Sequence, residues 1–176
     1  ERYINAEMEE EMEIQKKEVS GKEAEAQLRE GKPLYNCVIQ DAIVLSGSYS
    51  HPVKIADCEI EEIKATENCK FCENVQFNGS TFSKANFSHT VFEDEVFLCD
   101  STFEGKCDMG KVSFEHAEFG KTTFKSEVNF RDSEFSELAD FSNATFGDKA
   151  LFSHSKFNKG ANFRNAIFMD NASFER

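Results

Sequence analysis

The chain has 176 residues and a net charge of -13 at pH 7, and its 19 Phe residues contrast with no Trp and only 2 Pro. This length suffices for one domain with a real core. No apolar run approaches the roughly 18 residues that a membrane span needs, and the acidity argues against direct binding to nucleic acid. The first residue is Glu1 rather than Met, which suggests either a trimmed chain or a piece of a longer protein.

Residues 1–32 contain no Phe and read as helical. Ile4, Met8 and Met12 recur at a four-residue spacing among Glu and Lys, and Val19 extends the stripe, which predicts a first helix. This helix could pair with a partner or with a second copy of the chain.

A second helix is predicted directly before the rest of the chain. Ser20 and Glu23 have the spacing of a capping box, and the helix should run through Leu28 and stop at Gly31 before Pro33. We expect residues 1–32 to cap one end of the fold that follows, where unpaired strand edges would otherwise invite aggregation.

From residue 33 onward, large apolar residues recur at steps of five or six. Neither an α-helix nor a β-strand places side chains with this period on one face. Residues 33–74 keep the spacing irregularly, whereas residues 75–176 keep it with Phe at nearly every place. The upstream positions predicted to point inward are Leu34, Ile39, Val44, Tyr49, Ile55, Ile60 and Phe71.

In the Phe-rich part, a small or apolar residue stands two places before almost every large one. This pattern describes a short bridge whose two side chains point inward, and four bridges joined by corners make one square coil. Coils stacked at about 4.8 Å would pair their backbones as in a sheet and bury an apolar face that no repeat could bury alone. We expect the core stack to contain Phe119, Phe130, Phe141, Phe152, Phe163 and Phe174, with Met109 in place of one ring.

The stretches "ANFRNAIFMDNASF", "ADFSNATF" and "ANFSHTVF" closely resemble the pentapeptide repeat proteins, over about 100 residues. The resemblance implies an all-β solenoid, a right-handed quadrilateral β-helix. Counted from Leu34, this chain would form about seven coils, with the N-terminal helical segment as a cap.

The stretch "EDEVFLCD", residues 93–100, breaks the pattern. Counting Phe97 as inward would also turn Glu95 inward, and burying an unpaired carboxylate costs several kcal/mol. Taking Leu98 as the inward residue loses one ring, worth roughly 2 kcal/mol, and Leu98 returns most of it. We therefore predict the Leu98 register. An exposed Phe97 would then form a candidate interaction patch, whose members are Phe97, Cys99, Glu93, Asp94 and Asp100.

The six Cys and four His residues do not predict a site. The lone CxxC of Cys69 and Cys72 lacks the four ligands of a structural zinc site, and Cys37, Cys58, Cys69 and Cys107 stand at inward positions. His89, His116 and His154 stand at outward ones, and His89 and His154 are too far apart to share a metal. We expect no catalytic residues, metal or cofactor, and the free cysteines favour a reducing, cytoplasmic location.

The outward positions hold Asn, Ser, Asp, Glu and Lys, which predicts a hydrated rod without a groove. We therefore expect a non-catalytic scaffold that binds a protein partner, whose identity the sequence does not give. The resemblance adds an alternative, because some pentapeptide repeat proteins mimic DNA and act on DNA gyrase. A third interpretation is a structural rod that associates with itself through the helical N-terminal segment or through the coil near Phe168 and Phe174.

Overall fold

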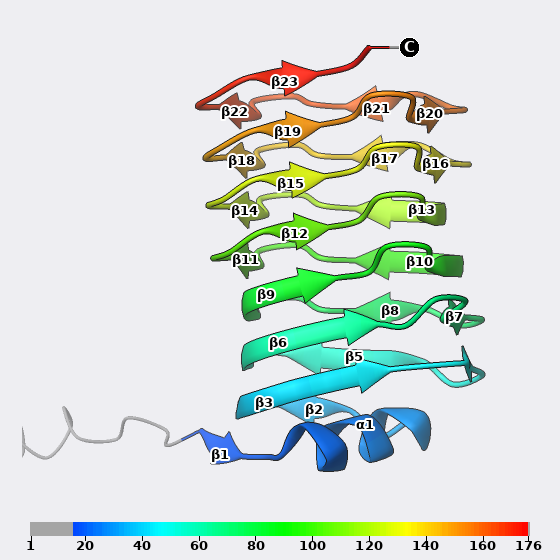
Figure 1. Cartoon of the computed structure of the whole chain (residues 1–176), viewed down its shortest axis with the longest axis vertical. Helices are drawn as coiled ribbons and strands as arrows, with labels where there is room; N and C mark the ends of the chain where they lie inside the picture. Colours follow the sequence, from blue (N-terminus) through cyan, green and yellow to red (C-terminus); the bar gives the residue numbers. More distant parts are fainter. Residues whose placement is uncertain (1–15, 176) are drawn as a thin grey trace, which may run out of the picture.

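The computed structural model describes residues 16–175, which form a stack of coils along one axis (Figure 1). Every strand pair is parallel, and each coil adds one strand to the neighbouring ladders. The pairing of Val75 with Val96 spans 21 residues and that of Ala117 with Ala139 spans 22, so one coil takes 21 or 22 residues. The described residues form a β-solenoid of about seven coils with one short helix at its N-terminal end, which confirms the predicted fold class.

The strands belong to two sheets that together make the four sides. The first sheet consists of β1 (Lys17–Glu18), β3 (Cys37–Leu45), β6 (Glu59–Ala65), β9 (Thr81–Asn86), β11 (Thr102–Phe103), β12 (Cys107–Asp108), β14 (Thr123–Phe124), β15 (Val128–Asn129), β18 (Thr145–Phe146), β19 (Ala150–Leu151), β22 (Ile167–Phe168) and β23 (Ala172–Ser173). The second sheet consists of β2 (Leu34–Tyr35), β4 (Ser48–Tyr49), β5 (Val53–Ala56), β7 (Lys70–Phe71), β8 (Val75–Gln76), β10 (Val91–Phe97), β13 (Ser113–Glu118), β16 (Glu134–Phe135), β17 (Ala139–Asp140), β20 (Lys156–Phe157) and β21 (Ala161–Asn162).

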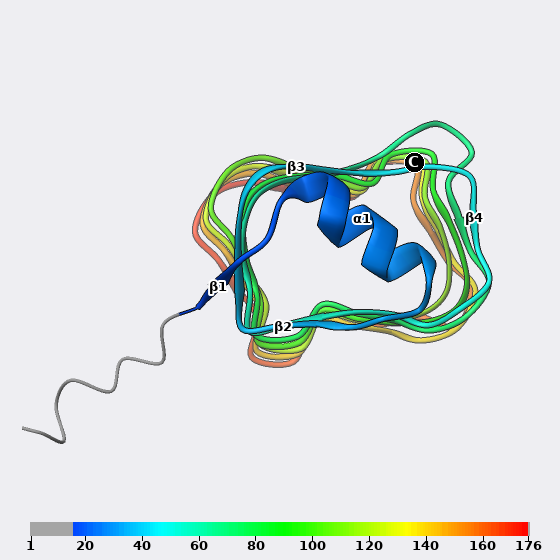
Figure 2. The ribbon, with the colours of Figure 1, turned by 90° about the horizontal axis from the view of Figure 1, so that it is seen from below.

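The helix α1 (Gly21–Arg29) lies across the N-terminal end of the stack (Figure 2). The Ser20 side chain accepts a hydrogen bond from the Glu23 amide, which caps the first turn, and Gly31 follows the last turn at φ 72°. Ala24 and Leu28 are fully buried against the first coil. At the other end of the helix, the Arg29 guanidinium lies 4.8 Å from the centre of the Tyr49 ring.

The segment before α1 differs from the prediction. Lys17 and Glu18 form β1, which pairs with Cys37 and Val38 of β3, so the first helix does not extend to Val19. As a strand, this segment forms hydrogen bonds with the open backbone edge of β3. A helix at the same place would leave the N–H and C=O groups of that edge without partners. The helix predicted around Ile4, Met8 and Met12 lies outside the described residues. The division into segments 1–32 and 33–176 stays a prediction.

A bulge in β3 corrects another expectation. Its register with β6 shifts between Ile39 and Ala42, so Ile43 and Leu45 are buried and Val44 is exposed, not inward as predicted. The bulge also brings the Asp41 carboxylate to the first amide of α1, that of Gly21. A carboxylate at this place satisfies an open amide and opposes the positive end of the helix dipole.

Two of the four corners turn through a residue in the left-handed conformation. The non-glycine residues there have φ between 50° and 65°, and the turns close with bonds such as that from the Thr122 amide to the Phe119 carbonyl, 3.1 Å. From Phe77 on, inward residues across these corners are always five apart. The left-handed positions are Asn36, Asp57, Gly79, Asp100, Lys121, Asn143 and Asn165 at one corner and Gly47, Asn68, His89, Lys111, Asp132 and His154 at the other.

The other two corners accommodate the six-residue steps. Where the step is five, as from Phe82 to Phe87, one strand runs through the corner. Where it is six, the strand divides, as into β11 and β12 from Phe103 to Met109, or stays continuous with a shift of register, as in β10 from Phe92 to Leu98. The alternation of five- and six-residue steps in the sequence therefore indicates which corners contain an extra residue.

The core consists of columns of rings stacked along the axis. Phe141 is parallel to Phe119 at 4.7 Å between ring centres and to Phe163 at 5.0 Å. Phe152 stacks in the same way on Phe130 at 5.0 Å and on Phe174 at 4.8 Å. Two more columns run through Phe82, Phe103, Phe124, Phe146 and Phe168 and through Tyr49, Phe71, Phe92, Phe114, Phe135 and Phe157.

We predict that replacing a ring inside a column costs much more than replacing one at its end. Phe141→Ala should lower the free energy of unfolding by about 3–5 kcal/mol, because it removes a fully buried ring and leaves a cavity. Phe174→Ala should cost less than half as much, since Phe174 is 50% exposed. Urea unfolding of both variants tests this, and equal losses would contradict the stacked core.

The contact between α1 and β3 predicts a second effect. A Cβ atom on Gly21 would overlap the Ala42 carbonyl, which belongs to the backbone and cannot move aside as a side chain can. Gly21→Ala should therefore destabilise the protein by about 1–3 kcal/mol despite the higher helix propensity of Ala. Lys22→Ala, at an exposed position of the same turn, is the matched control and should be neutral or slightly stabilising in the same unfolding measurement.

Candidate functional surfaces

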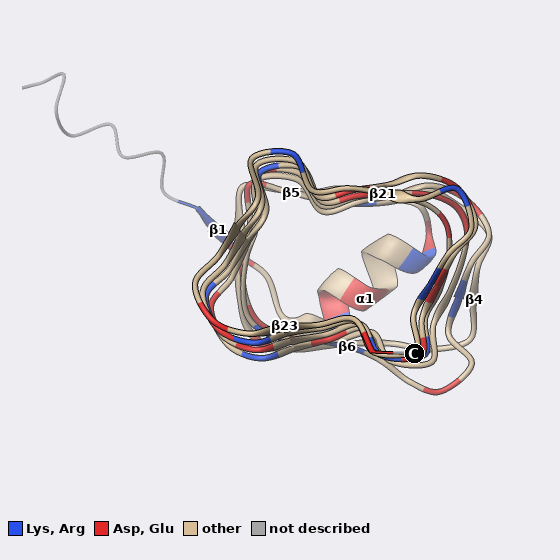
Figure 3. Ribbon diagram, turned by 90° about the horizontal axis from the view of Figure 1, so that it is seen from above, with Lys and Arg blue, Asp and Glu red and all other residues tan. Residues whose placement is uncertain are grey.

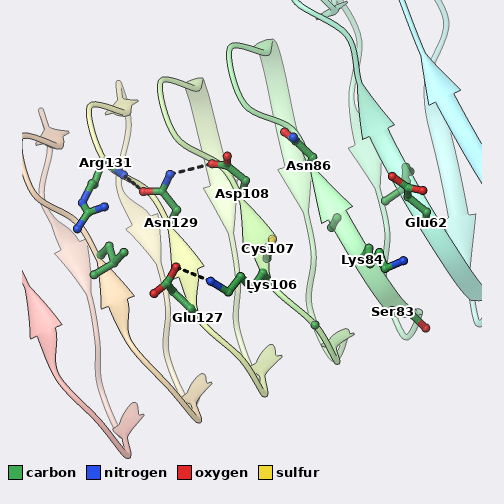
Figure 4. A pocket seen from close by; sticks show the side chains of 14 residues that line it. Glu62, Ser83, Lys84, Asn86, Lys106, Cys107, Asp108, Glu127, Asn129 and Arg131 are labelled. Atoms are coloured by element: carbon green, nitrogen blue, oxygen red, sulfur yellow. Dashed lines mark hydrogen bonds and ion pairs between the residues drawn. The ribbon is translucent and has the colours of Figure 1, made fainter.

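One side of the solenoid carries a groove of about 570 Å³ (Figure 4). It runs over β6, β9, β12, β15 and β19, between two rows of outward side chains. The expectation of a rod without a groove is therefore wrong. One row includes Glu62, Lys84, Lys106 and Glu127, and the other includes Asn86, Asp108, Asn129 and Leu151.

The groove arises where the corner changes from a five-residue to a six-residue step. In β9 the chain runs straight through the corner, whereas one coil later the extra residue pushes the corner outward at Gly105 and Lys106. The Gly105 amide donates to the Ser83 carbonyl at 3.1 Å, and a Cβ atom on Gly105 would overlap that oxygen. The change of step was visible in the sequence, but the hollow depends on how successive corners stack.

The polar groups of the groove bind one another rather than converging on one point. Lys106 points to Glu127, with 3.5 Å between Nζ and Oε1, and away from Lys84 (Figure 4). Asn129 Nδ2 donates to Asp108 Oδ1 at 2.8 Å, and the same oxygen accepts from the Gly110 amide. Small-molecule sites instead aim a few polar groups at one place.

At the irregular stretch, the structure has the Leu98 register. Val96 and Leu98 are buried, Glu95 is exposed, and the pairing of β10 with β13 shifts between Phe92 and Glu95. Phe97 points outward between Gln76 and Glu118 in the neighbouring coils. Its ring is half-buried rather than fully exposed, which corrects the expected degree of exposure.

The five residues of the candidate interaction patch spread over more than one side. Phe97 and Cys99 lie on the same side, where the Cys99 Sγ lies 4.0 Å from a Glu118 carboxylate oxygen. Glu93 lies before the corner and pairs with Lys70 at 2.6 Å. Asp100 occupies the next corner, 3.9 Å from Lys121. Only Phe97 and Cys99, with Asp94 beside them at the corner, can face one partner surface, and the role of the patch stays a prediction.

The inward cysteines behave as core residues. Cys37, Cys58, Cys69 and Cys107 are at most 4% exposed, and all six cysteines are free. Burial raises the pKa of the Cys58 and Cys69 thiols from 9.0 to about 11, and it raises the pKa of Cys107 well above 9.0. Such thiols are poor nucleophiles at neutral pH.

The three outward histidines lie where the sequence placed them. His89 and His154 occupy left-handed corner positions, and His154 Nδ1 lies 3.7 Å from Asp132 Oδ1. His116 Nε2 lies 3.2 Å from Glu118 Oε1. Among residues 16–175 there is no cluster of three or more His, Cys, Asp or Glu that could hold a metal ion. No helix in the same range is long and apolar enough to cross a membrane.

The Leu98 register makes opposite predictions for two neighbouring residues. Leu98→Ala should cost about 2–5 kcal/mol of stability, because the side chain is 1% exposed and fills a core column. Phe97→Ser should cost about 1 kcal/mol or less, because its ring points outward. Denaturant unfolding of both variants tests this. A larger loss of stability in Phe97→Ser than in Leu98→Ala would contradict the Leu98 register.

The raised thiol pKa values predict alkaline destabilisation. In the unfolded chain these thiols ionise near 9, but in the folded protein they stay neutral until about 11. The stabilisation of the folded state by these neutral thiols is therefore complete below pH 9 and is lost as the pH rises from 9 to 11. The free energy of unfolding should fall over this range. In a variant with Cys58→Ala and Cys69→Ala it should fall less, and an identical fall would contradict the assignment.

The stacked coils are also recognisable by sequence comparison. The family model described as pentapeptide repeats (9 copies) matches residues 110–149 and 141–176. No curated protein and no solved structure matches the chain. The unmatched coils continue the same columns, since Phe92 stacks on Phe114 at 5.3 Å and on Phe71 at 5.0 Å. The family match over residues 110–176 and the Phe-rich repeating solenoid together support a pentapeptide repeat protein.

Proposed function

We propose that the chain is a non-catalytic scaffold that binds a protein partner along the sides of its solenoid. One observation carries this proposal: outward side chains stand in straight rows with a fixed register, such as Gln76, Phe97, Glu118, Asp140 and Asn162. The stacked backbone already holds these rows in place before a partner binds. Binding therefore costs little conformational entropy for ordering the side chains. Extended surfaces of this kind are what solenoid proteins use for binding.

The polar groups on the surface support a scaffold rather than an enzyme. In the groove, Lys106, Asp108, Glu127 and Asn129 are occupied by hydrogen bonds and ion pairs to one another. Catalysis needs a nucleophile or base aimed at a shared reacting atom. We also propose a cytoplasmic location, supported by the six unbridged thiols.

Photo-crosslinking along each side tests the scaffold proposal. A photoreactive residue is placed in turn at Gln76, Lys125, Asn129 and Glu134, which point outward on different sides. After irradiation in an extract of the native cells, we expect one protein to be crosslinked from one side or two adjacent sides. Crosslinks that are equally weak and unselective at all four positions would contradict a partner-binding scaffold.

The charge pattern supports DNA mimicry less well than it supports the scaffold. Acidic and basic residues are interspersed around the outline of the ribbon (Figure 3). Many also pair across coils, as Lys125 does with Glu104 at 2.9 Å and Lys159 with Glu137. Rows that neutralise themselves present no continuous negative strand to a basic saddle. We expect no inhibition of gyrase supercoiling by the chain at low salt and no protection from a quinolone, and salt-sensitive inhibition would favour mimicry instead.

Self-association is a second candidate, favoured by apolar side chains on the last described coil. Ile167, Met169 and Phe174 are 53%, 69% and 50% exposed. A hollow of about 610 Å³ lies beside Phe152, Phe157 and Phe174. Sedimentation equilibrium over a range of concentrations tests it. A mass that rises with concentration and returns to one chain in Met169→Lys would support end-to-end contacts.

A further inference from the structure

One side of the solenoid, here called the Phe97 face, combines an outward ring with acidic groups. It comprises β5, β8, the end of β10, the end of β13, β17 and β21. Its outward row has six members, begins at Lys54 and ends at Asn162, and spans roughly 24 Å at about 4.8 Å per coil. Phe97 is the only aromatic member of this row, whose other members are Lys54, Gln76, Glu118, Asp140 and Asn162.

Three acids near Phe97 have no partner in an ion pair, whereas several acids on other sides have one. On other sides Glu127 pairs with Lys106 and Glu104 with Lys125. Among the ion pairs of residues 16–175, none includes Asp94, Glu95 or Asp140. The partner of Glu118 on this face is His116, which is charged only when protonated. Asp94, Glu95 and Asp140 are therefore left without a cationic partner, although Asp140 accepts hydrogen bonds from Ser142 and Asn162.

The ring and the acids suit the same kind of side chain. A guanidinium or ammonium group can lie over an aromatic ring while its neighbours pair with carboxylates. The solenoid already contains this contact near its N-terminal end, where Lys54 Nζ lies 5.3 Å from the centre of the Tyr35 ring. Phe97 has an outward position and flanking acids, but no cation of the chain over its ring among the described residues.

We propose that the Phe97 face binds an arginine-rich segment of a partner protein. One arginine stacks on Phe97, and its neighbours pair with Glu95, Asp94 and Asp140. This inference rests on the proposed scaffold function and adds the chemistry of the partner. It also explains why a ring stands in a row of polar residues, since a half-buried Phe97 is already held in place for stacking.

Fluorescence anisotropy with a labelled peptide of alternating Arg and Ser tests the proposal on the full chain. We expect the native protein to bind this peptide more tightly than the matching Lys and Ser peptide, with affinity falling as salt rises. Phe97→Ser and Glu95→Gln should each weaken binding several-fold, and Glu95→Gln should also reduce the dependence on salt. Both residues point outward, so cooperative unfolding with a stability loss of about 1 kcal/mol or less would show that the variants fold.

Glu67→Gln is the matched control, because Glu67 is an exposed acid at a corner away from the Phe97 face. It should bind the Arg peptide as the native protein does. Equal weakening by Glu67→Gln and Glu95→Gln, or full affinity in Phe97→Ser, would overturn the proposal, since the attraction would then come from net charge. Absence of binding to the native protein would overturn it as well. The scaffold function would still stand if crosslinks came from another side.

Discussion

The structure depends on parallel stacking at a single spacing. Backbones pair at about 4.8 Å from coil to coil, and the Phe rings of each column lie parallel at nearly the same separation, 4.7 Å for Phe119 and Phe141. One geometry thus satisfies the backbone hydrogen bonds and packs the core. A ring in one coil is covered by the side chains of the coils above and below it, so much of the stability comes from contacts between neighbouring coils.

This constraint fixes the positions of the inward residues but allows the number of residues to vary at two of the four corners. Inward residues must keep their columns, and the chain tolerates a poor fit at one coil rather than break a column: at residues 93–100 it turns Phe97 outward and places Leu98 in the core. From Phe77 on, corners with a left-handed residue keep a step of five, whereas the other two accept an extra residue. Surface features that could serve function, the groove beside Gly105 and the outward Phe97, both arise where the chain departs from the regular repeat.

The N-terminal end shows how the stack is closed. Asp41 and Ser20 satisfy the first amides of α1, and Gly21 permits close contact with Ala42. Ala24 and Leu28 then cover the first coil. The bulge that supplies Asp41 also turns Val44 to solvent. A local rule, the regular inward spacing, is broken here because the cap needs a carboxylate at the helix terminus.

The sequence by itself determined the repeat, the inward columns, the Ser20 cap and the choice between Phe97 and Leu98. Each follows from spacing and from the cost of burying a charge or leaving an amide open. Only the tertiary structure decided the strand at Lys17–Glu18, the bulge at Asp41, the half-burial of Phe97 and the groove. These depend on contacts between coils about 21 residues apart in the chain, which no local pattern encodes. The distribution of paired and unpaired acids is of the same kind, because it depends on which side chains the stacking brings together.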